Sequence, residues 1–231
     1  MRRSLVCVVS IFWVLLVWSL AQAAEQSLPA GFVYLDTDRA GIQLDLRYLG
    51  ENNFIGQRVD GYEAQRCILT AQAAEAVLKV REELRLFGLS LKIFDAYRPQ
   101  RAVDHFVRWA RDLDDTTMKG AYYPEVRKEE LFDKGYIAER SGHTRGSTVD
   151  VTVVAVEGSG FRELDMGTGF DFFGPQSWPT DRTMEPEQRA NRLLLRQVMT
   201  KHGFKPYDYE WWHFTLKDEP FPDTYFEFPV R

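Results

Sequence analysis

The most informative stretch of this sequence is Ser141-Gly142-His143-Thr144-Arg145-Gly146-Ser147-Thr148-Val149-Asp150. Two glycines flank the histidine, which predicts a turn. β-Branched residues dominate from Thr148 to Ala155 and predict a strand directly after it. Asp150 lies among valines in that strand, where an ionised carboxylate is costly unless it is paired or bound to a metal. We therefore expect His143 to fold back beside Asp150, so that the two side chains supply two ligands of a metal site.

A third ligand candidate interrupts another apolar stretch, Tyr209 to Leu216, which we expect to be a strand. This residue is His213, and Glu210 precedes it by three positions. Catalytic zinc favours three N or O ligands and one position for water, and His143, Asp150 and His213 give that number. Glu210 is then the candidate general base. Strand alternation would place it on the face opposite His213, so a bulge or the strand's end must intervene.

Each of these residues also has a structural alternative. A lone histidine in a strand is commonly a satisfied core or surface residue. Asp150 alone could cap the backbone or pair with an arginine such as Arg145. It is the combination of these residues, rather than any one of them, that favours a metal centre.

Two more polar positions are candidates for contacts with a substrate. Arg98 follows a predicted strand at 89–94 and precedes Pro99, which disfavours helix geometry just before it. Its guanidinium could stabilise an oxyanion, or it could form a structural salt bridge with Asp95. Asp171 ends a glycine-containing loop and could bind a substrate ammonium or simply form a turn.

The rest of the chain predicts one α+β domain, with a mostly antiparallel central sheet and helices packed on it. Helices are expected at about 70–87, 101–113 and 185–202, where apolar residues recur at helical spacing. The segment 31–53 is expected to be extended, with one or two short strands. No repeat and no low-complexity linker divides the region from 24 to 231, which we therefore interpret as a single domain.

Residues 1–23 have the features of a secretory signal peptide. Arg2 and Arg3 precede an apolar run at 5–20, and Ala21-Gln22-Ala23 supplies a small-x-small cleavage pattern. An uncleaved membrane anchor is the alternative, because the run is almost long enough to span a bilayer. We expect cleavage, a periplasmic or secreted protein, and no stable membrane insertion afterwards.

The composition excludes several partners and site types. The chain carries a net charge of −5, and loss of the two arginines would take it to about −7, which argues against nucleic-acid binding. Cleavage would also leave Cys67 as the only cysteine, so that neither an intramolecular disulfide nor a cysteine-rich zinc site is possible. Any metal must then be held by histidine and carboxylate.

These motifs together resemble the VanX-type D-alanyl-D-alanine dipeptidases, in the zinc peptidase family that also contains D,D-carboxypeptidases of the VanY kind. The resemblance covers nearly the whole chain after the leader. It is carried by Asn53-Phe54, Val59-Asp60-Gly61-Tyr62, Tyr97-Arg98-Pro99, the Ser141–Asp150 stretch, Met166-Gly167 with Phe170-Asp171, Glu210-Trp211-Trp212-His213, and the closing Asp218-Glu219-Pro220 with Phe228-Pro229. Ala96 departs from the glycine expected before Tyr97.

The resemblance implies one Zn²⁺ per chain, held by His143, Asp150 and His213. It implies Glu210 as the base, Arg98 as the transition-state arginine, and Asp171 as the ligand of the substrate amine, with Tyr48 and Ser141 as pocket residues. The implied reaction is hydrolysis of the small dipeptide D-alanyl-D-alanine to two D-alanines. The alternatives are a D,D-carboxypeptidase or endopeptidase acting on longer peptidoglycan peptides, and a non-catalytic zinc-binding module.

Overall fold

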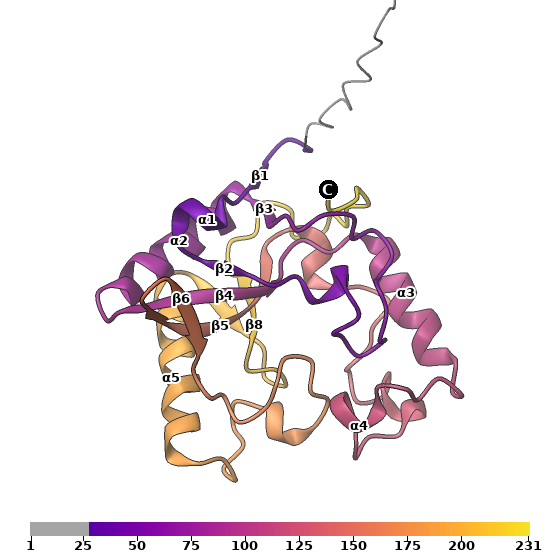
Figure 1. Cartoon of the computed structure of the whole chain (residues 1–231). Coiled ribbons are helices and arrows are strands. Elements are labelled where there is room, and N and C mark those ends of the chain that lie inside the picture. The colour runs from indigo at the N-terminus through magenta and orange to yellow at the C-terminus, as the bar shows by residue number, and fades with distance from the viewer. Residues whose placement is uncertain (1–27) are drawn as a thin grey trace, which may run out of the picture.

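The computed structural model describes residues 28–231, so the predicted signal peptide at 1–23 lies outside the described residues. A six-stranded sheet forms the centre of the fold (Figure 1). The strands run in the order β2 (Gln43–Leu44), β4 (Leu89–Asp95), β5 (Thr148–Glu157), β8 (His213–Leu216) and β7 (Phe204–Pro206), and β6 (Gly160–Glu163) also pairs with β5. The sheet is mixed, because β2 runs parallel to β4 while the other pairs are antiparallel.

The central strand β5 determines where the polar side chains meet. Its residues from Thr148 to Val154 are buried, in keeping with their β-branched sequence. Asp150 pairs with Asp95 of β4 on one side and with His213 of β8 on the other. Directly opposed residues of neighbouring strands lie close together, so this register places three polar side chains in one row across the sheet.

Helices cover the sheet and its edges. Helix α2 (Ala71–Arg85) packs against β4 and against α5 (Pro186–Lys201), and both helices lie on the same side of the sheet in Figure 1. The side chain of Thr70 caps α2 as its position in the sequence predicts, by accepting a bond from the Ala73 amide. The shorter helices are α1 (Thr37–Ala40), α3 (Gln100–Arg111) and α4 (Lys119–Tyr122), and the 3₁₀ helices are η1 (Arg47–Leu49), η2 (Lys128–Glu130), η3 (Gly142–Arg145) and η4 (Pro175–Ser177).

A second sheet and the C-terminal segment close the fold around the segment that follows β4. The two-stranded sheet pairs β1 (Phe32–Tyr34) with β3 (Ile68–Thr70). The Tyr97 ring stacks on Phe228 with centroids 4.0 Å apart, and its hydroxyl donates to the Phe228 carbonyl. This packing fixes the backbone on the N-terminal side of Arg98. Within residues 28–231, no helix is long and apolar enough to cross a membrane.

One predicted strand is shorter than expected. The stretch Tyr209–Leu216 forms a strand only from His213 onward, and Glu210 lies in the turn that precedes it. The turn is closed by the amide of His213, which donates to the Glu210 carbonyl at 3.4 Å. The expected conflict between opposite strand faces therefore does not arise.

Candidate metal centre

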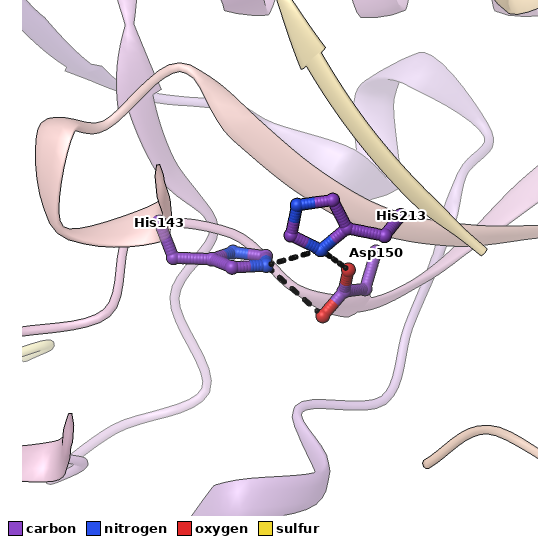
Figure 2. A group of neighbouring side chains, drawn as sticks. All are labelled: His143, Asp150 and His213. Carbon is purple, nitrogen blue, oxygen red and sulfur yellow. Dashed lines mark hydrogen bonds and ion pairs between the residues drawn. The ribbon is translucent and has the colours of Figure 1, made fainter. Parts of the chain in front are cut away.

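Three separate elements bring His143, Asp150 and His213 together (Figure 2). His143 lies in η3, which Ser141 caps by accepting a bond from the His143 amide and which ends at Gly146 in the left-handed region, at φ 81°. Asp150 belongs to β5, and His213 is the first residue of β8. Figure 2 shows the two imidazoles and the carboxylate pointing toward one another.

The spacing of these side chains suits a tetrahedral metal ion. Nε2 of His143 lies 3.3 Å from Nδ1 of His213, and the Asp150 oxygens lie 3.2 Å and 3.1 Å from the two nitrogens. Tetrahedral bonds of the usual zinc length put ligand atoms roughly 3.3 Å apart. Two imidazole nitrogens and one carboxylate oxygen are also a donor set typical of catalytic zinc. The three residues therefore fit a zinc ion.

The surroundings of these residues support the same conclusion. His143 is fully buried, and its Nδ1 lies 2.7 Å from the Ala96 carbonyl, an acceptor that holds the ring so that Nε2 faces Asp150. Either glycine or alanine at 96 can supply that carbonyl. Oδ1 of Asp150 is buried, and its contact with Nδ1 of His213 at 3.1 Å is an ion pair that lacks hydrogen-bond geometry, which is costly for a carboxylate in a metal-free site. Burial raises the pKa of Asp150, but His143 and His213 outweigh it and hold the pKa below its ordinary value.

Glu210 is the free carboxylate beside this group. Its Oε2 lies 3.5 Å from Nδ1 of His213, and its side chain is 17% exposed. Burial raises the pKa of Glu210 to about 7, against the opposing effect of His213. A carboxyl with a pKa near neutrality is well suited to accept a proton and release it again.

Arg98 forms the salt bridge that its sequence position suggested, and it also lies beside the three ligand candidates. Its Nε and Nη2 bond Oδ2 of Asp95 at 2.9 Å and 2.8 Å, which is the structural salt bridge. The same Nη2 lies 3.6 Å from Oδ2 of Asp150, and the side chain lines the cavity next to the three ligands. Tyr62 donates to the other oxygen of Asp95 at 2.6 Å, so that the carboxylate is held from two sides.

Asp171 lies at a buried end of the same cavity and is 5% exposed. The Tyr48 hydroxyl donates to its Oδ2 at 2.8 Å. Burial raises the pKa of Asp171 well above its ordinary value, and the Asp150 charge adds to this effect. The backbone at Asp171 has φ 61°, an uncommon conformation for a residue other than glycine. The ionised form of such a buried carboxylate is stabilised strongly when a cation binds beside it.

The cavity has a volume of about 260 Å³, which is small for a ligand pocket. All eight residues singled out from the sequence contribute to this site. Seven of them, including Ser141 and Tyr48, line the cavity directly. The eighth, His143, is buried behind the lining, where it contacts Asp150 and His213.

The sequence marked Asp95 only as a partner of Arg98. Its position at the end of an apolar strand carries the same signal as Asp150, namely a carboxylate where burial is expected. Arg140 and Tyr207 also line the cavity, and no sequence pattern marked them.

Comparison with known proteins gives the family. The D-ala-D-ala dipeptidase family model, Peptidase_M15, matches residues 29–231. The chain is 39% identical to a D-alanyl-D-alanine dipeptidase of Enterococcus faecium, with 87% of this chain and 98% of the relative covered. It is 42% identical to a dipeptidase of the same name from Streptomyces coelicolor, over 86% and 98% of the two chains, and 41% identical to one from Enterococcus faecalis, over 87% and 98%. The family model covers the whole candidate metal site, and the chain belongs to the Peptidase_M15 family of D-Ala-D-Ala dipeptidases.

Proposed function

We propose that this chain is a zinc-dependent dipeptidase that hydrolyses D-alanyl-D-alanine to two D-alanines. The observation that carries the proposal is the group of two imidazoles and one carboxylate, with donor atoms 3.1–3.3 Å apart and the Glu210 carboxylate beside them, in a member of the dipeptidase family. His143, Asp150 and His213 would hold the ion. When bound, zinc supplies a Lewis acid that polarises the scissile carbonyl and lowers the pKa of water.

Glu210 moves the proton in this mechanism. Its carboxylate takes a proton from the attacking water, while the water oxygen forms a bond to the carbonyl carbon of the first D-alanine. The protonated Glu210 then gives the proton to the nitrogen of the second D-alanine as the C–N bond breaks. The carboxyl ends the cycle as it began, and its pKa of about 7 allows both transfers near neutral pH.

Arg98 and Asp171 position the reacting groups. Arg98 lies 3.6 Å from Asp150, so its guanidinium can donate to the carbonyl oxygen as negative charge develops there. Asp95 holds that guanidinium in place. Asp171, which also accepts a hydrogen bond from Tyr48, accepts hydrogen bonds from the substrate's free ammonium at the buried end of the cavity. A buried amine site excludes peptides that are extended at the N-terminus, which favours dipeptides over longer wall peptides.

The decisive assay measures D-alanine release by the purified chain. We expect hydrolysis of D-Ala-D-Ala, with L-Ala-L-Ala and a pentapeptide ending in D-Ala-D-Ala cleaved much more slowly. A chelator should abolish turnover and zinc should restore it. Preference for the pentapeptide would instead indicate a carboxypeptidase, and zinc binding without turnover of any of the three would indicate a non-catalytic module.

We also propose that the protein is exported, on the basis of the basic start, the apolar run and the Ala21-Gln22-Ala23 pattern. N-terminal sequencing of the protein from its native host tests this. A mature chain beginning at Ala24 supports export with cleavage, whereas a chain that keeps residues 1–23 contradicts cleavage.

A further inference from the structure

Charged side chains in the cavity are unevenly matched. Three carboxylates line it, from Asp150, Asp171 and Glu210. Two guanidiniums line it, and one of them, Arg98, already bonds Asp95 through Nε and Nη2. The other is Arg140, which is exposed and makes no ion pair or hydrogen bond with any residue between 28 and 231. A ligand carboxylate entering this cavity therefore finds a cation whose hydrogen bonds are not already used.

The Arg140 guanidinium lies over an aromatic ring. Its Cζ lies 4.7 Å from the centroid of the Tyr225 ring, a cation–π contact. Arg145 approaches the same ring at 5.8 Å, and two hydrogen bonds of 2.9 Å and 2.6 Å tie Arg145 to Glu219. Tyr225 is thus a supported platform. This contact uses none of the guanidinium's hydrogen bonds to oxygen, so its N–H groups stay available to match the two oxygens of a carboxylate.

Arg140 and Asp171 differ in depth. Asp171 is buried, whereas Arg140 is exposed at the rim of the cavity. Arg140 precedes the metal ligand His143 by three residues, which limits the separation of their Cα atoms to roughly 10 Å. An extended dipeptide spans roughly 7 Å from its amine to its carboxylate. A substrate whose amine faces Asp171 therefore directs its carboxylate toward the open side.

We infer that Arg140 binds the carboxylate of the substrate's C-terminal residue and thereby sets the requirement for a free C-terminus. The inference rests on the proposed function and extends it to a residue at the rim. It also fixes the orientation of the substrate, whose amine lies deep in the cavity while its carboxylate lies at the rim.

The test compares two substrates that differ only at this group, D-Ala-D-Ala and its C-terminal amide, with wild type, Arg140→Gln and Arg140→Lys. A charge-assisted hydrogen-bonded pair contributes enough that Arg140→Gln should lower kcat/KM for the dipeptide by about 10- to 100-fold, mainly through KM. The amide should change by less than about threefold, because its uncharged end gains little from the guanidinium. Arg140→Lys should recover part of the loss.

Arg127→Gln is the matched control, because Arg127 is an exposed arginine that does not line the cavity. It should leave both substrates unaffected. An equal loss for dipeptide and amide in Arg140→Gln, or no loss for either, would overturn the inference while hydrolysis by the wild type leaves the proposed function standing.

If the wild type hydrolyses neither substrate, the proposed function fails, and calorimetric binding decides the inference separately. Measured in a Glu210→Gln background, Arg140→Gln should then weaken binding of the dipeptide but not of the amide. Equal binding of the dipeptide with and without Arg140→Gln would contradict the inference.

Discussion

Glu210 and Asp150 are neighbouring carboxylates whose environments drive their pKa values apart. Burial raises the pKa of Glu210 to about 7, whereas the two imidazoles hold the pKa of Asp150 below its usual range. Such a separation assigns different roles to chemically similar groups. Asp150 stays ionised and suits a metal ligand, and Glu210 can exchange a proton near neutral pH.

The first consequence concerns turnover. Glu210→Gln keeps the size of the side chain but removes its ability to accept a proton, so kcat should fall by about 10²- to 10⁴-fold. Zinc content should stay at one per chain, because Glu210 is not among the three ligand candidates. Steady-state kinetics and metal analysis of the same preparation check both points. Asp208→Asn, an exposed position two residues before Glu210, is the control and should keep full activity.

The second consequence concerns the stability of the metal-free protein. Folding raises the pKa of Glu210, so the native state binds the proton more tightly than the unfolded state does. Protonation of Glu210 therefore adds to the free energy of unfolding, and this gain is fully present below the ordinary pKa of 4.5. It is lost as the pH rises through about 7. Metal-free Glu210→Gln should therefore be more stable than metal-free wild type at pH 8 by about 1–3 kcal/mol, and the two should converge near pH 4.5. Urea unfolding at both pH values measures this, and a constant difference across the range would contradict it.

Among the elements, those with a strong local pattern are the ones that sequence predicts well. The helix capped by Thr70 and the strand containing Asp150 appear as expected. The short strands β6 and β7 have too few residues to show a period, and α1 has four residues, so none of them was predicted. The strand expected from Tyr209 begins only at His213, because Trp211 and Trp212 before it are buried in a turn and Tyr209 is exposed.

The turn that carries His143 depends on one glycine. Gly146 has φ 81°, and a Cβ at this position would overlap the Phe32 ring. Gly146→Ala should lower the free energy of unfolding by about 2–4 kcal/mol and reduce zinc affinity, because strain and overpacking add at a residue next to η3. Gly88→Ala is the matched control, since Gly88 also has positive φ, at 70°, but a Cβ added there would meet no atom within 4 Å. It should cost only about 1 kcal/mol and leave zinc binding unchanged. Equal effects of the two changes would contradict this account of the turn.

Across the whole molecule, the sequence predicted the class of fold and the side chains that gather at the candidate metal centre better than it predicted the topology. Mixed helices and strands were expected, but the parallel pairing of β2 with β4 was not, because a two-residue strand at a sheet edge has no sequence signature. Arg140 was missed for a related reason. Its position at the cavity depends on packing against Tyr225, which is 85 residues away in the chain and visible only in three dimensions.

Zinc binding should also raise the free energy of unfolding of the whole domain, because the ligand candidates come from three separate elements, η3, β5 and β8. Zinc at about a thousand times its dissociation constant should stabilise the fold by about 4 kcal/mol. Thermal unfolding with chelator and with zinc should show this gain in wild type and in Glu210→Gln, but not in His213→Ala. A zinc-dependent gain that persists in His213→Ala would place the ion elsewhere.

The most direct test of the metal centre is anomalous diffraction from crystals of the zinc-loaded protein, with data collected on both sides of the zinc absorption edge. We predict one strong zinc peak per chain, about 2.0–2.2 Å from Nε2 of His143, Nδ1 of His213 and an oxygen of Asp150, with Glu210 nearby but not bound. A peak at other side chains, or no peak in protein that hydrolyses the dipeptide, would contradict it.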